Sequence, residues 1–405
     1  MAEIVLGVGG GIAAYKACEL VRRFSEAGHR VRVVPTEAAL RFVGAPTWEA
    51  LSGQPVAADV WSDAHEVPHV QLGRTAELVV VAPATADLLA KAATGAADDL
   101  LTNTLLTARC PVLFAPAMHT EMWEHPATVA NVATLRARGA VVVEPAVGRL
   151  TGPDTGKGRL PEPAELFALA TRLLARPDQR PDLTGRRVVV TAGGTREPLD
   201  PVRFLGNRSS GRQGYALART AVARGATVQV VAANVDLPDP AGAEVLRVET
   251  TEQLRTATLA AARQADVVVM AAAPCDFRPA EVSAEKIKKD ASGRLELSLV
   301  ATPDIAAELG VAKPSGQVLV AFAAETATGP AALANARAKL AAKRADLIVL
   351  NEVGGGEGRQ DPFGSDYNAA TVLAADGATT VLPRATKEEL ADAIWDLVKP
   401  LLGSA

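Results

Sequence analysis

Short apolar runs alternate with longer segments of helical periodicity over most of this 405-residue chain. The runs at 4–8, 31–34 and 77–82 are rich in Val, Ile and Leu, as is typical of parallel strands buried on both faces. Segments 12–27 and 98–108 have the spacing of amphipathic helices. The alternation predicts a parallel sheet with helices on both faces. Later in this half we expect a strand at 112–114, a helix at 121–138 and a strand at 140–143.

A polar segment at 176–185 (RPDQRPDLTG) contains two prolines, which indicates a linker. The α/β pattern restarts after it, with strands expected at 187–190, 228–232, 266–270, 318–322 and 347–350, and helices ending at 224 and spanning 252–263 and 331–344. The end differs, because apolar runs at 369–375 and 379–382 flank Asp376-Gly377, a hairpin signal. A last helix is expected at 387–398. We therefore predict an α/β protein with domains at 1–175 and 186–405.

A long polar loop, 191–215, follows the strand expected at 187–190. Four arginines add positive charge to it: Arg196, Arg203, Arg208 and Arg212. Ser210 precedes Gln213 by the three residues of a capping box, so a helix is expected to begin near Gly211. A glycine-rich loop that enters a helix N-terminus presents free N–H groups and the positive end of the helix dipole. The loop is predicted to bind an anion, and an ordinary basic surface loop is the alternative.

Composition narrows the possible classes of protein. Hydrophobic residues make up 48% of the chain and aromatic residues 4%, so large cores of Ala, Val and Leu are expected. The net charge of −4 does not suit a general nucleic-acid binder. Cys18, Cys110 and Cys275 lie far apart, which suits a reducing cytoplasm and neither a disulfide framework nor a zinc cluster. No uninterrupted apolar run approaches the roughly 20 residues of a membrane helix. We expect a cytoplasmic protein without a nucleic-acid or membrane partner.

A second glycine-rich loop, 7–14 (GVGGGIAA), follows the first expected strand. Read from Gly9 it fits G-x-G-x-x-A, a form of the dinucleotide fingerprint. An NAD site needs an acid at the tip of the second strand, but the chain has Pro35-Thr36 there, with Glu37 just beyond. A hydroxyl suits a mononucleotide phosphate better than a ribose diol. A mononucleotide is therefore favoured, and a turn that only needs small residues is the alternative.

Two histidines are candidates for chemistry. His69 lies in VPHVQL, and His119 follows the strand expected at 112–114. His119 is therefore expected at the carboxyl edge of the sheet, where open α/β sheets bind ligands. For each, a packing or surface role is the alternative.

Longer motifs in both halves resemble known families. The first half resembles the flavin-dependent 4′-phosphopantothenoylcysteine decarboxylases in the His69 segment and in GGGIAAYK (9–16), APATADL (82–88), PAMH (116–119) and GRLTGPDTGKGRL (148–160). The second half resembles phosphopantothenate–cysteine ligase in the segment 191–211, in EKIKK (285–289) and in AFAAET (321–326). In this order the halves resemble the bifunctional coenzyme A biosynthesis family of bacteria. The resemblance implies two Rossmann-like domains, a flavodoxin-like parallel sheet first and a nucleotide-binding α/β ligase domain second.

The resemblance implies that the first half binds FMN and decarboxylates 4′-phospho-N-pantothenoylcysteine to 4′-phosphopantetheine. FMN would take two electrons from the thiol side and return them later, because the carbanion otherwise has no sink. His69 would be the base near the substrate thiol. Six residues would hold the FMN phosphate and ring edge: Gly10, Gly11, Ile12, Ala13, Thr36 and Thr85.

Two positions depart from the family pattern. His119 stands where the family usually has an Asn that binds the substrate carboxylate. Thr151 stands where the family often has a Cys that donates a proton, and a hydroxyl is a much weaker acid than a thiol. We expect an active variant in which His119 or a bound water supplies the proton. A charged His119 would both pair with the carboxylate and donate a proton.

The resemblance implies that the second half joins cysteine to 4′-phosphopantothenate, using CTP through an acyl-cytidylate. Lysines and Mg²⁺, whose ligands the sequence does not reveal, would neutralise the triphosphate. Asn207 would bind the acyl-nucleotide carbonyl, and Arg203 would help position it. The resemblance places ten residues at the nucleotide: Ala272, Asp276, Lys286, Pro303, Asp304, Ile305, Ala306, Phe322, Lys339 and Lys343. Cys275 is interpreted as a small buried thiol.

Two alternatives stay open. One is an active ligase whose first half is an impaired flavin-binding or regulatory domain, and the other is an NAD(P)-dependent oxidoreductase. The resemblance also implies a homo-oligomer, with trimeric contacts in the first half and dimeric contacts in the second, and a dodecamer as one such assembly.

Overall fold

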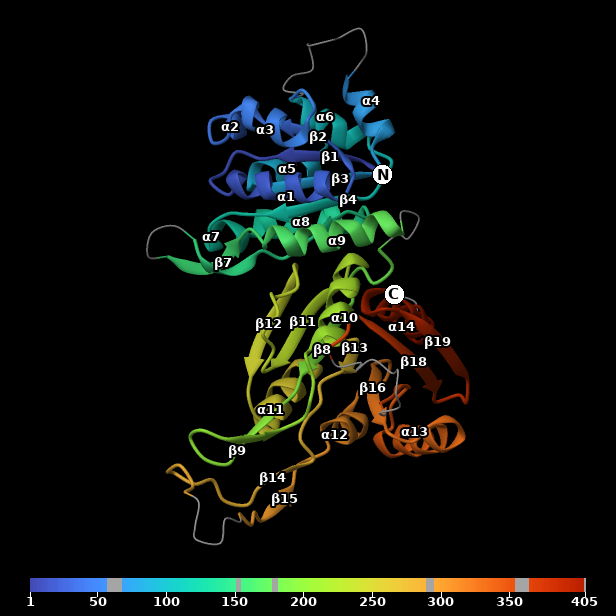
Figure 1. Cartoon of the computed structure of the whole chain (residues 1–405). Coiled ribbons are helices and arrows are strands. Elements are labelled where there is room, and N and C mark those ends of the chain that lie inside the picture. The colour runs from blue at the N-terminus through green and yellow to red at the C-terminus, as the bar shows by residue number, and fades with distance from the viewer. Residues whose placement is uncertain (57–67, 151–153, 177–180, 289–294, 354–363, 404–405) are drawn as a thin grey trace. The chain divides into compact units, whose positions relative to one another are not determined.

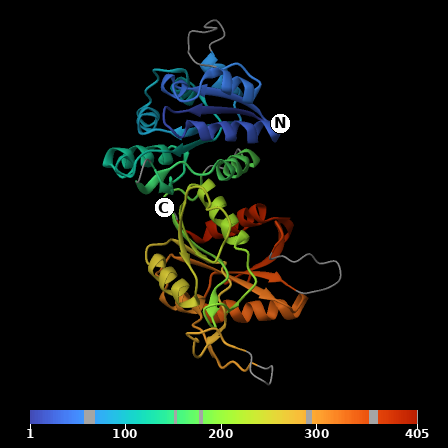
Figure 2. The same ribbon diagram turned by 60° about the vertical axis from the view of Figure 1, so that its left-hand side comes forward.

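The computed structural model of the chain describes residues 1–56, 68–150, 154–176, 181–288, 295–353 and 364–403. They form two compact units. The first is Met1–Gly185 with Val222–Thr227 and Pro240–Ala243, and the second is the remainder. Each unit is a sheet with helices on both sides (Figures 1 and 2). No helix in the described part of the chain has the length and apolarity needed to cross a membrane.

The first unit contains a five-stranded parallel sheet in the order β2-β1-β3-β4-β5. Its strands are β1 (Glu3–Val8), β2 (Arg30–Pro35), β3 (Leu78–Ala84), β4 (Val112–Pro116) and β5 (Val141–Val142). Every residue of β3 is buried, as expected for a strand covered on both faces. This strand order is that of flavodoxin-like folds, so the predicted fold class is confirmed.

Helices cover both faces of this sheet. They are α1 (Ala14–Glu26), α2 (Glu37–Leu40), α3 (Ala45–Ser52), α4 (Pro68–Thr75), α5 (Ala86–Thr94), α6 (Leu100–Thr107), α7 (Thr120–Trp123), α8 (Pro126–Ala137) and α9 (Pro163–Ala175). The apolar faces of α5, α6 and α8 share one core with β1, β3 and β4. Helices α1, α3 and α9 pack together on β2 and β3. An antiparallel hairpin of β6 (Ala146–Arg149) and β7 (Thr155–Arg159) follows β5.

Two predicted boundaries in this unit are wrong. The helix expected at 121–138 is two helices, because Pro126 begins α8 and the side chain of His125 caps it by accepting the N–H of Ala127. Proline is favoured at the first helical position but interrupts the preceding hydrogen-bond pattern. The strand expected at 77–82 instead runs from Leu78 to Ala84 as β3.

The second unit contains an eight-stranded sheet in the order β12-β11-β8-β13-β16-β17-β18-β19. Its strands are β8 (Arg187–Gly193), β11 (Thr227–Ala233), β12 (Ala243–Val248), β13 (Val267–Met270), β16 (Val318–Glu325), β17 (Leu347–Glu352), β18 (Tyr367–Ala374) and β19 (Thr379–Thr386). Strands β8, β13, β16 and β17 are parallel. The first six strands follow the dinucleotide-fold order 3-2-1-4-5-6. The antiparallel pair β18–β19 is the predicted hairpin, with Gly377 at φ 94° in its turn.

The helices of this unit are α10 (Arg212–Ala223), α11 (Thr251–Ala262), α12 (Ile305–Ala312), α13 (Gly329–Lys343), α14 (Lys387–Val398) and the short 3₁₀ helix η2 (Lys399–Leu401). Helices α11, α12 and α13 share the core on one face of the sheet. On α14, the indole N–H of Trp395 donates to Leu217 O of α10. Helix α14 spans the predicted residues, since Thr386 and Glu389 form a capping box.

Local ribbons that sequence periodicity did not predict complete the unit. Strand β9 (Arg196–Pro198) pairs with β10 (Phe204–Gly206), and β14 (Phe277–Pro279) pairs with β15 (Leu299–Ala301). The predicted capping box at Ser210 is wrong, because Gln213 donates its side-chain amide to Lys387 O and its Oε1 has no partner among the described residues. Within the predicted linker, Leu183 is fully buried.

Candidate functional site

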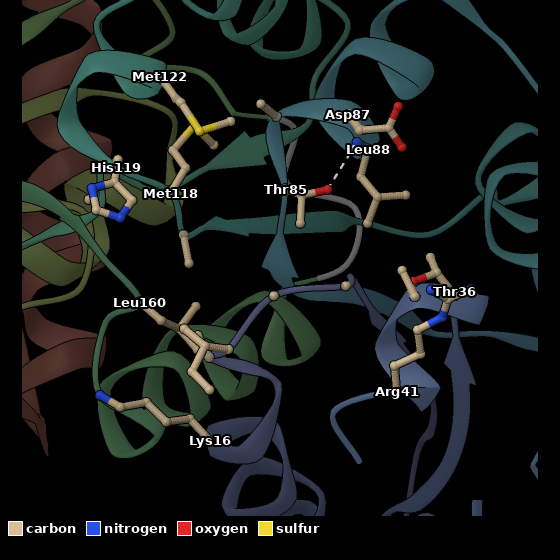
Figure 3. A pocket seen from close by; sticks show the side chains of 18 of the residues that line it. Lys16, Thr36, Arg41, Thr85, Asp87, Leu88, Met118, His119, Met122 and Leu160 are labelled. Atoms are coloured by element: carbon tan, nitrogen blue, oxygen red, sulfur yellow. Dashed lines mark hydrogen bonds between the residues drawn. The ribbon is translucent and has the colours of Figure 1, made fainter. Parts of the chain in front are cut away.

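A cavity of about 990 Å³ opens at the carboxyl edge of the first sheet (Figure 3). The segments that follow β1, β2, β3 and β4 all contribute to its lining, as expected for an open parallel sheet. Its lining includes all six residues predicted to hold FMN: Gly10, Gly11, Ile12, Ala13, Thr36 and Thr85. It also contains His119. The structure therefore brings these seven predicted residues together around one space.

The loop between β1 and α1 forms one wall of the cavity. The N–H groups of Gly10, Ile12 and Ala13 donate to no atom of the described residues. A Cβ on Gly10 would lie 2.3 Å from Ala38 Cβ, so only glycine fits between this loop and α2. Free N–H groups before a helix suit a phosphate.

Two hydroxyls at other helix N-termini also line the cavity. Thr36 Oγ1 accepts the N–H of Ala39 and caps α2, and Thr85 Oγ1 accepts the N–H of Leu88 and caps α5. Each hydroxyl uses an acceptor position in its cap and retains its O–H donor. Both threonines can therefore donate to an anionic or carbonyl oxygen in the cavity.

His119 lies at the N-terminus of α7 without a capping bond from its side chain. Neither ring nitrogen has a hydrogen-bond partner within the described ranges. Figure 3 shows its ring near Met118 and Met122. The residue before it, Met118, donates its N–H to Gly158 O of β7, which ties this segment to the hairpin. The imidazole is available to a ligand in the cavity.

Basic side chains at the cavity are balanced by carboxylates. Glu162 lies 3.2 Å from Lys16 Nζ and 2.6 Å from Arg159 Nη2. Lys91 Nζ lies 2.9 Å from Asp98 and 3.2 Å from Asp87. The hydrogen bond with Asp98 is the main cause that raises the pKa of Lys91. The ammonium group therefore stays charged beside the site.

His69 is not among the residues that line the cavity. It lies in the first turn of α4, and its carbonyl accepts Thr107 Oγ1 at 2.8 Å. Its Nδ1 is buried and has no partner in the described part of the chain. His69 thus lies outside the set of residues that line the cavity with His119. Thr151, the other position that departs from the family pattern, lies outside the described residues.

The arginines of the loop 191–215 do not form one free cationic patch. Arg203 pairs with Asp200 at 2.5 Å and Arg212 with Asp366 at 2.7 Å. Arg196 stacks over the ring of Phe204, and Arg208 is exposed. Carboxylates therefore neutralise two of the four arginines that were expected to add positive charge.

Two of the three predicted triphosphate lysines form ion pairs. Lys339 Nζ lies 2.6 Å from Glu325 Oε1, and Lys343 Nζ lies 2.6 Å from Asp304 Oδ2. The hydrogen bond from Lys339 lowers the pKa of Glu325. Lys286 is exposed and has no partner among the described residues, whereas Lys289 of the same motif lies outside them.

The other predicted ligase residues follow β8 or β13, lie on β16 or begin α12. Asn207 donates to Pro274 O at 2.8 Å, and Ala272 donates its N–H to Thr191 Oγ1. Phe322 is partly buried on β16, and Asp276 is exposed. The predicted start of α12 is confirmed, with Asp304 as its N-cap after Pro303 and with Ile305 and Ala306 buried in its first turn. Cys275 is buried, and burial raises the pKa of its thiol, which fits an inert small side chain.

A second cavity, of about 460 Å³, lies between α13 and the β18–β19 turn. None of the predicted ligase residues lines it.

The chain matches two family models. Residues 1–175 match the family described as "Flavoprotein", and residues 183–401 match "DNA/pantothenate metabolism flavoprotein C-terminal domain". The "Coenzyme A biosynthesis bifunctional protein CoaBC" of Mycobacterium tuberculosis is 58% identical over 409 residues, with 99% of this chain and 97% of that protein covered. The chain belongs to the CoaBC family of coenzyme A biosynthesis bifunctional proteins.

A second relative agrees with this membership. The CoaBC of Bacillus subtilis is 43% identical and covers 95% of this chain and 93% of its own length. A crystal structure of the C-terminal domain of a CoaBC protein is 34% identical, with a TM-score of 0.46, and covers 55% of this chain and 97% of that domain.

A flavin mononucleotide fits the residues of the first cavity. The free N–H groups of Gly10, Ile12 and Ala13 suit its phosphate, and the apolar side chains of Met118 and Leu160 suit its ring system. Drug-sized ligands occupy pockets of about 300–1,000 Å³, and this cavity lies at the upper end of that range.

Several residues of this cavity were not assigned to the site from the sequence: Lys16, Arg41, Lys91, Met118, Met122 and Leu160. Met118 directly precedes His119 after β4, so its position at the end of a strand could have indicated it. The others lie on separate elements whose convergence depends on the folded sheet.

Proposed function

We propose that the chain catalyses two steps of coenzyme A biosynthesis. Its second half joins cysteine to 4′-phosphopantothenate, using CTP, and its first half decarboxylates the product to 4′-phosphopantetheine. The observation that carries the proposal is the match to CoaBC proteins over 99% of the chain, together with one cavity that gathers all six predicted FMN residues. The division into domains 1–175 and 186–405 is part of the proposal.

In the first half, the loop N–H groups and the hydroxyls of Thr36 and Thr85 would hold FMN by its phosphate and ring edge. When bound, FMN supplies an electron sink for the decarboxylation. His69 would take the thiol proton of the substrate. Since His69 does not line the cavity of its own chain, this role depends on the predicted homo-oligomer. His119 would bind the substrate carboxylate and supply a proton.

In the second half, Lys286, Lys339 and Lys343 would contact the triphosphate, and Asn207 the acyl-nucleotide carbonyl. Phosphate oxygens would replace Glu325 and Asp304 as the partners of their lysines. No group of three His, Cys, Asp or Glu side chains in the described segments could hold a metal ion. Mg²⁺ is commonly bound by substrate phosphates and water, so its role here would not require such a group. The free thiols of Cys18, Cys110 and Cys275 suit the cytoplasm as the site of this chemistry.

One assay tests both steps. Purified protein is supplied with CTP, cysteine and 4′-phosphopantothenate, and pyrophosphate and CO₂ are followed separately. Release of both products supports the proposal. Release of pyrophosphate without CO₂ would indicate that the first half is a flavin-binding domain without decarboxylase activity.

The variant His69→Asn distinguishes an active decarboxylase from a regulatory flavin-binding subunit. We expect it to retain the visible flavin absorbance, to release pyrophosphate as before and to lose CO₂ release. Unchanged CO₂ release in this variant would exclude His69 as the base.

A further inference from the structure

Asp200 is a buried acid that neither the sequence motifs nor the proposed mechanism assigns a role. It lies in the loop between β9 and β10 and is 3% exposed. Its Oδ1 accepts the N–H groups of Val202 and Arg203, both at 2.8 Å. Its Oδ2 accepts Nε and Nη2 of Arg203 at 2.9 and 2.5 Å and the N–H of Ile287 at 3.1 Å. The carboxylate therefore receives five hydrogen bonds.

These bonds keep Asp200 ionised. Burial alone would raise the pKa of its carboxyl group, but the hydrogen bonds from Arg203, Val202 and Ile287 outweigh burial and hold the pKa well below its usual value. Four of the five donors lie within three residues of Asp200. The fifth, Ile287, is 87 residues away in the sequence. The acid therefore joins two distant segments.

The backbone of Ile287 is held from both sides. Its N–H donates to Asp200, and its carbonyl accepts Arg203 Nη2 at 2.5 Å. A third bond runs from Ser283 N to Leu199 O at 3.0 Å. Ile287 lies directly between Lys286 and Lys288, whose side chains are exposed and have no partner in the described part of the chain. The bonds fix the backbone and leave both ammonium groups available.

We propose that Asp200 is a positioning residue of the ligase half, which acts with Arg203 to hold the backbone of Ile287 and thereby keeps Lys286 at the nucleotide phosphates. The proposal rests on the proposed ligase function. The described residues between β14 and β15 form neither a helix nor a strand. The backbone around Ile287 is therefore held in place by its hydrogen bonds to Asp200 and Arg203 and not by regular secondary structure. Fixing a cation before the ligand binds avoids an entropic cost at binding. Arg203 then acts through its neighbours, and not chiefly on the acyl-nucleotide.

The test uses Asp200→Asn in the full-length protein. The amide keeps the shape of the carboxylate, but it turns an NH₂ group toward the Arg203 and Ile287 donors. We expect the KM for CTP in the ligase reaction to rise about tenfold or more, with a smaller fall in kcat. Hydrogen exchange at the Ile287 amide should accelerate. Decarboxylation of added phosphopantothenoylcysteine, which uses the first half, should stay unchanged and report that the chain is folded.

A matched control and a double variant isolate the mechanism. Glu281→Gln removes one charge from the same segment at an exposed residue without a partner and should leave the KM unchanged. Asp200→Asn combined with Lys286→Met should be little worse than Lys286→Met alone, because Asp200 acts through Lys286. If Asp200→Asn does not fold, Arg203→Lys removes the two-point contact instead and should raise the KM in the same way.

The outcomes are distinct. An unchanged KM in Asp200→Asn with faster exchange at Ile287, or additive effects in the double variant, would overturn the positioning role. A wild-type protein that releases no pyrophosphate would instead overturn the ligase function, before any variant is compared.

Discussion

Lys343 Nζ lies 2.6 and 2.8 Å from the two carboxylate oxygens of Asp304. Asp304 also caps α12 by accepting the N–H of Ala307 at 3.0 Å. Burial would raise the pKa of Asp304, but Lys343 and the N–H of Ala307 outweigh burial and lower the pKa. The carboxylate of Asp304 therefore stays paired with Lys343 until a more highly charged anion displaces it.

Variants at these two residues should have different effects on nucleotide binding. Lys343→Met removes a charged hydrogen bond, so the KM for CTP should rise about 10- to 100-fold. Asp304→Asn keeps an oxygen for the helix cap and releases the lysine, so the KM should stay equal or fall. Arg337→Gln, an exposed cation without a partner on the same helix, is the control. Equal effects of Lys343→Met and Arg337→Gln would show a general charge effect only.

Gly10→Ala should abolish flavin binding. The new methyl group would lie 2.3 Å from Ala38 Cβ, so the loop would have to move away from α2 and its N–H groups would lose their arrangement. The ratio of visible flavin absorbance to protein in the purified variant measures this loss. Gly44→Ala is the control, because its nearest neighbour, Pro46 Cδ, would lie 3.7 Å away. Full flavin content in Gly10→Ala would contradict the placement of the phosphate at this loop.

The fold could be predicted from the sequence wherever local patterns decide it. The apolar strands, the hairpin at Asp376-Gly377 and α14 with its Thr386 cap all carry short-range signals. The ribbon of β14 and β15 could not be predicted, because pairs such as Phe277 with Ala301 depend on long-range contacts. The edge strand β12 was missed although its alternate residues are exposed, a pattern typical of a half-buried strand.

The residues of the candidate sites also divide into those that the sequence predicts and those that it does not. The FMN residues belong to three contiguous motifs, each at the end of a strand, so strand order alone brings them together. The partners of the ligase lysines could not be predicted. Lys343 and Asp304 are 39 residues apart on different helices, and the family resemblance gave both to the nucleotide without indicating their ion pair.

Glu144 should make the first unit sensitive to acid. Its carboxylate lies 2.8 Å from Arg136 of α8 and 2.9 Å from Lys157 of β7, so it anchors the hairpin that lines the cavity. Burial would raise the pKa of Glu144, but the two cations outweigh burial and lower it. A lowered pKa in the folded state means that the stabilisation is present above the unfolded value of about 4.3 and is lost as the pH falls through the folded value.

Glu144→Gln therefore should destabilise the first unit at pH 7 by about 1–3 kcal/mol, since it leaves two cations without their anion. The difference from wild type should shrink as the pH falls below about 4.3. Thermal unfolding followed by flavin release over this range measures it. Glu121→Gln, at a mostly exposed acid without a partner on α7, is the control. A difference that does not depend on pH would contradict the assigned ion pairs.

His119 should be required for decarboxylation and not for flavin binding. It lines the cavity, both ring nitrogens lack partners among the described residues, and Thr151 stands where the family often has a proton-donating cysteine. His119→Asn restores the residue that usually binds the substrate carboxylate but cannot donate a proton as an acid. We expect a near-normal KM for phosphopantothenoylcysteine and a kcat lower by about 10²- to 10⁴-fold. His125→Asn makes the same change at the cap of α8, where Asn also caps well, and should keep full activity. If His119→Asn kept its kcat, a water or another group would supply the proton, and His119 would serve only to bind the carboxylate.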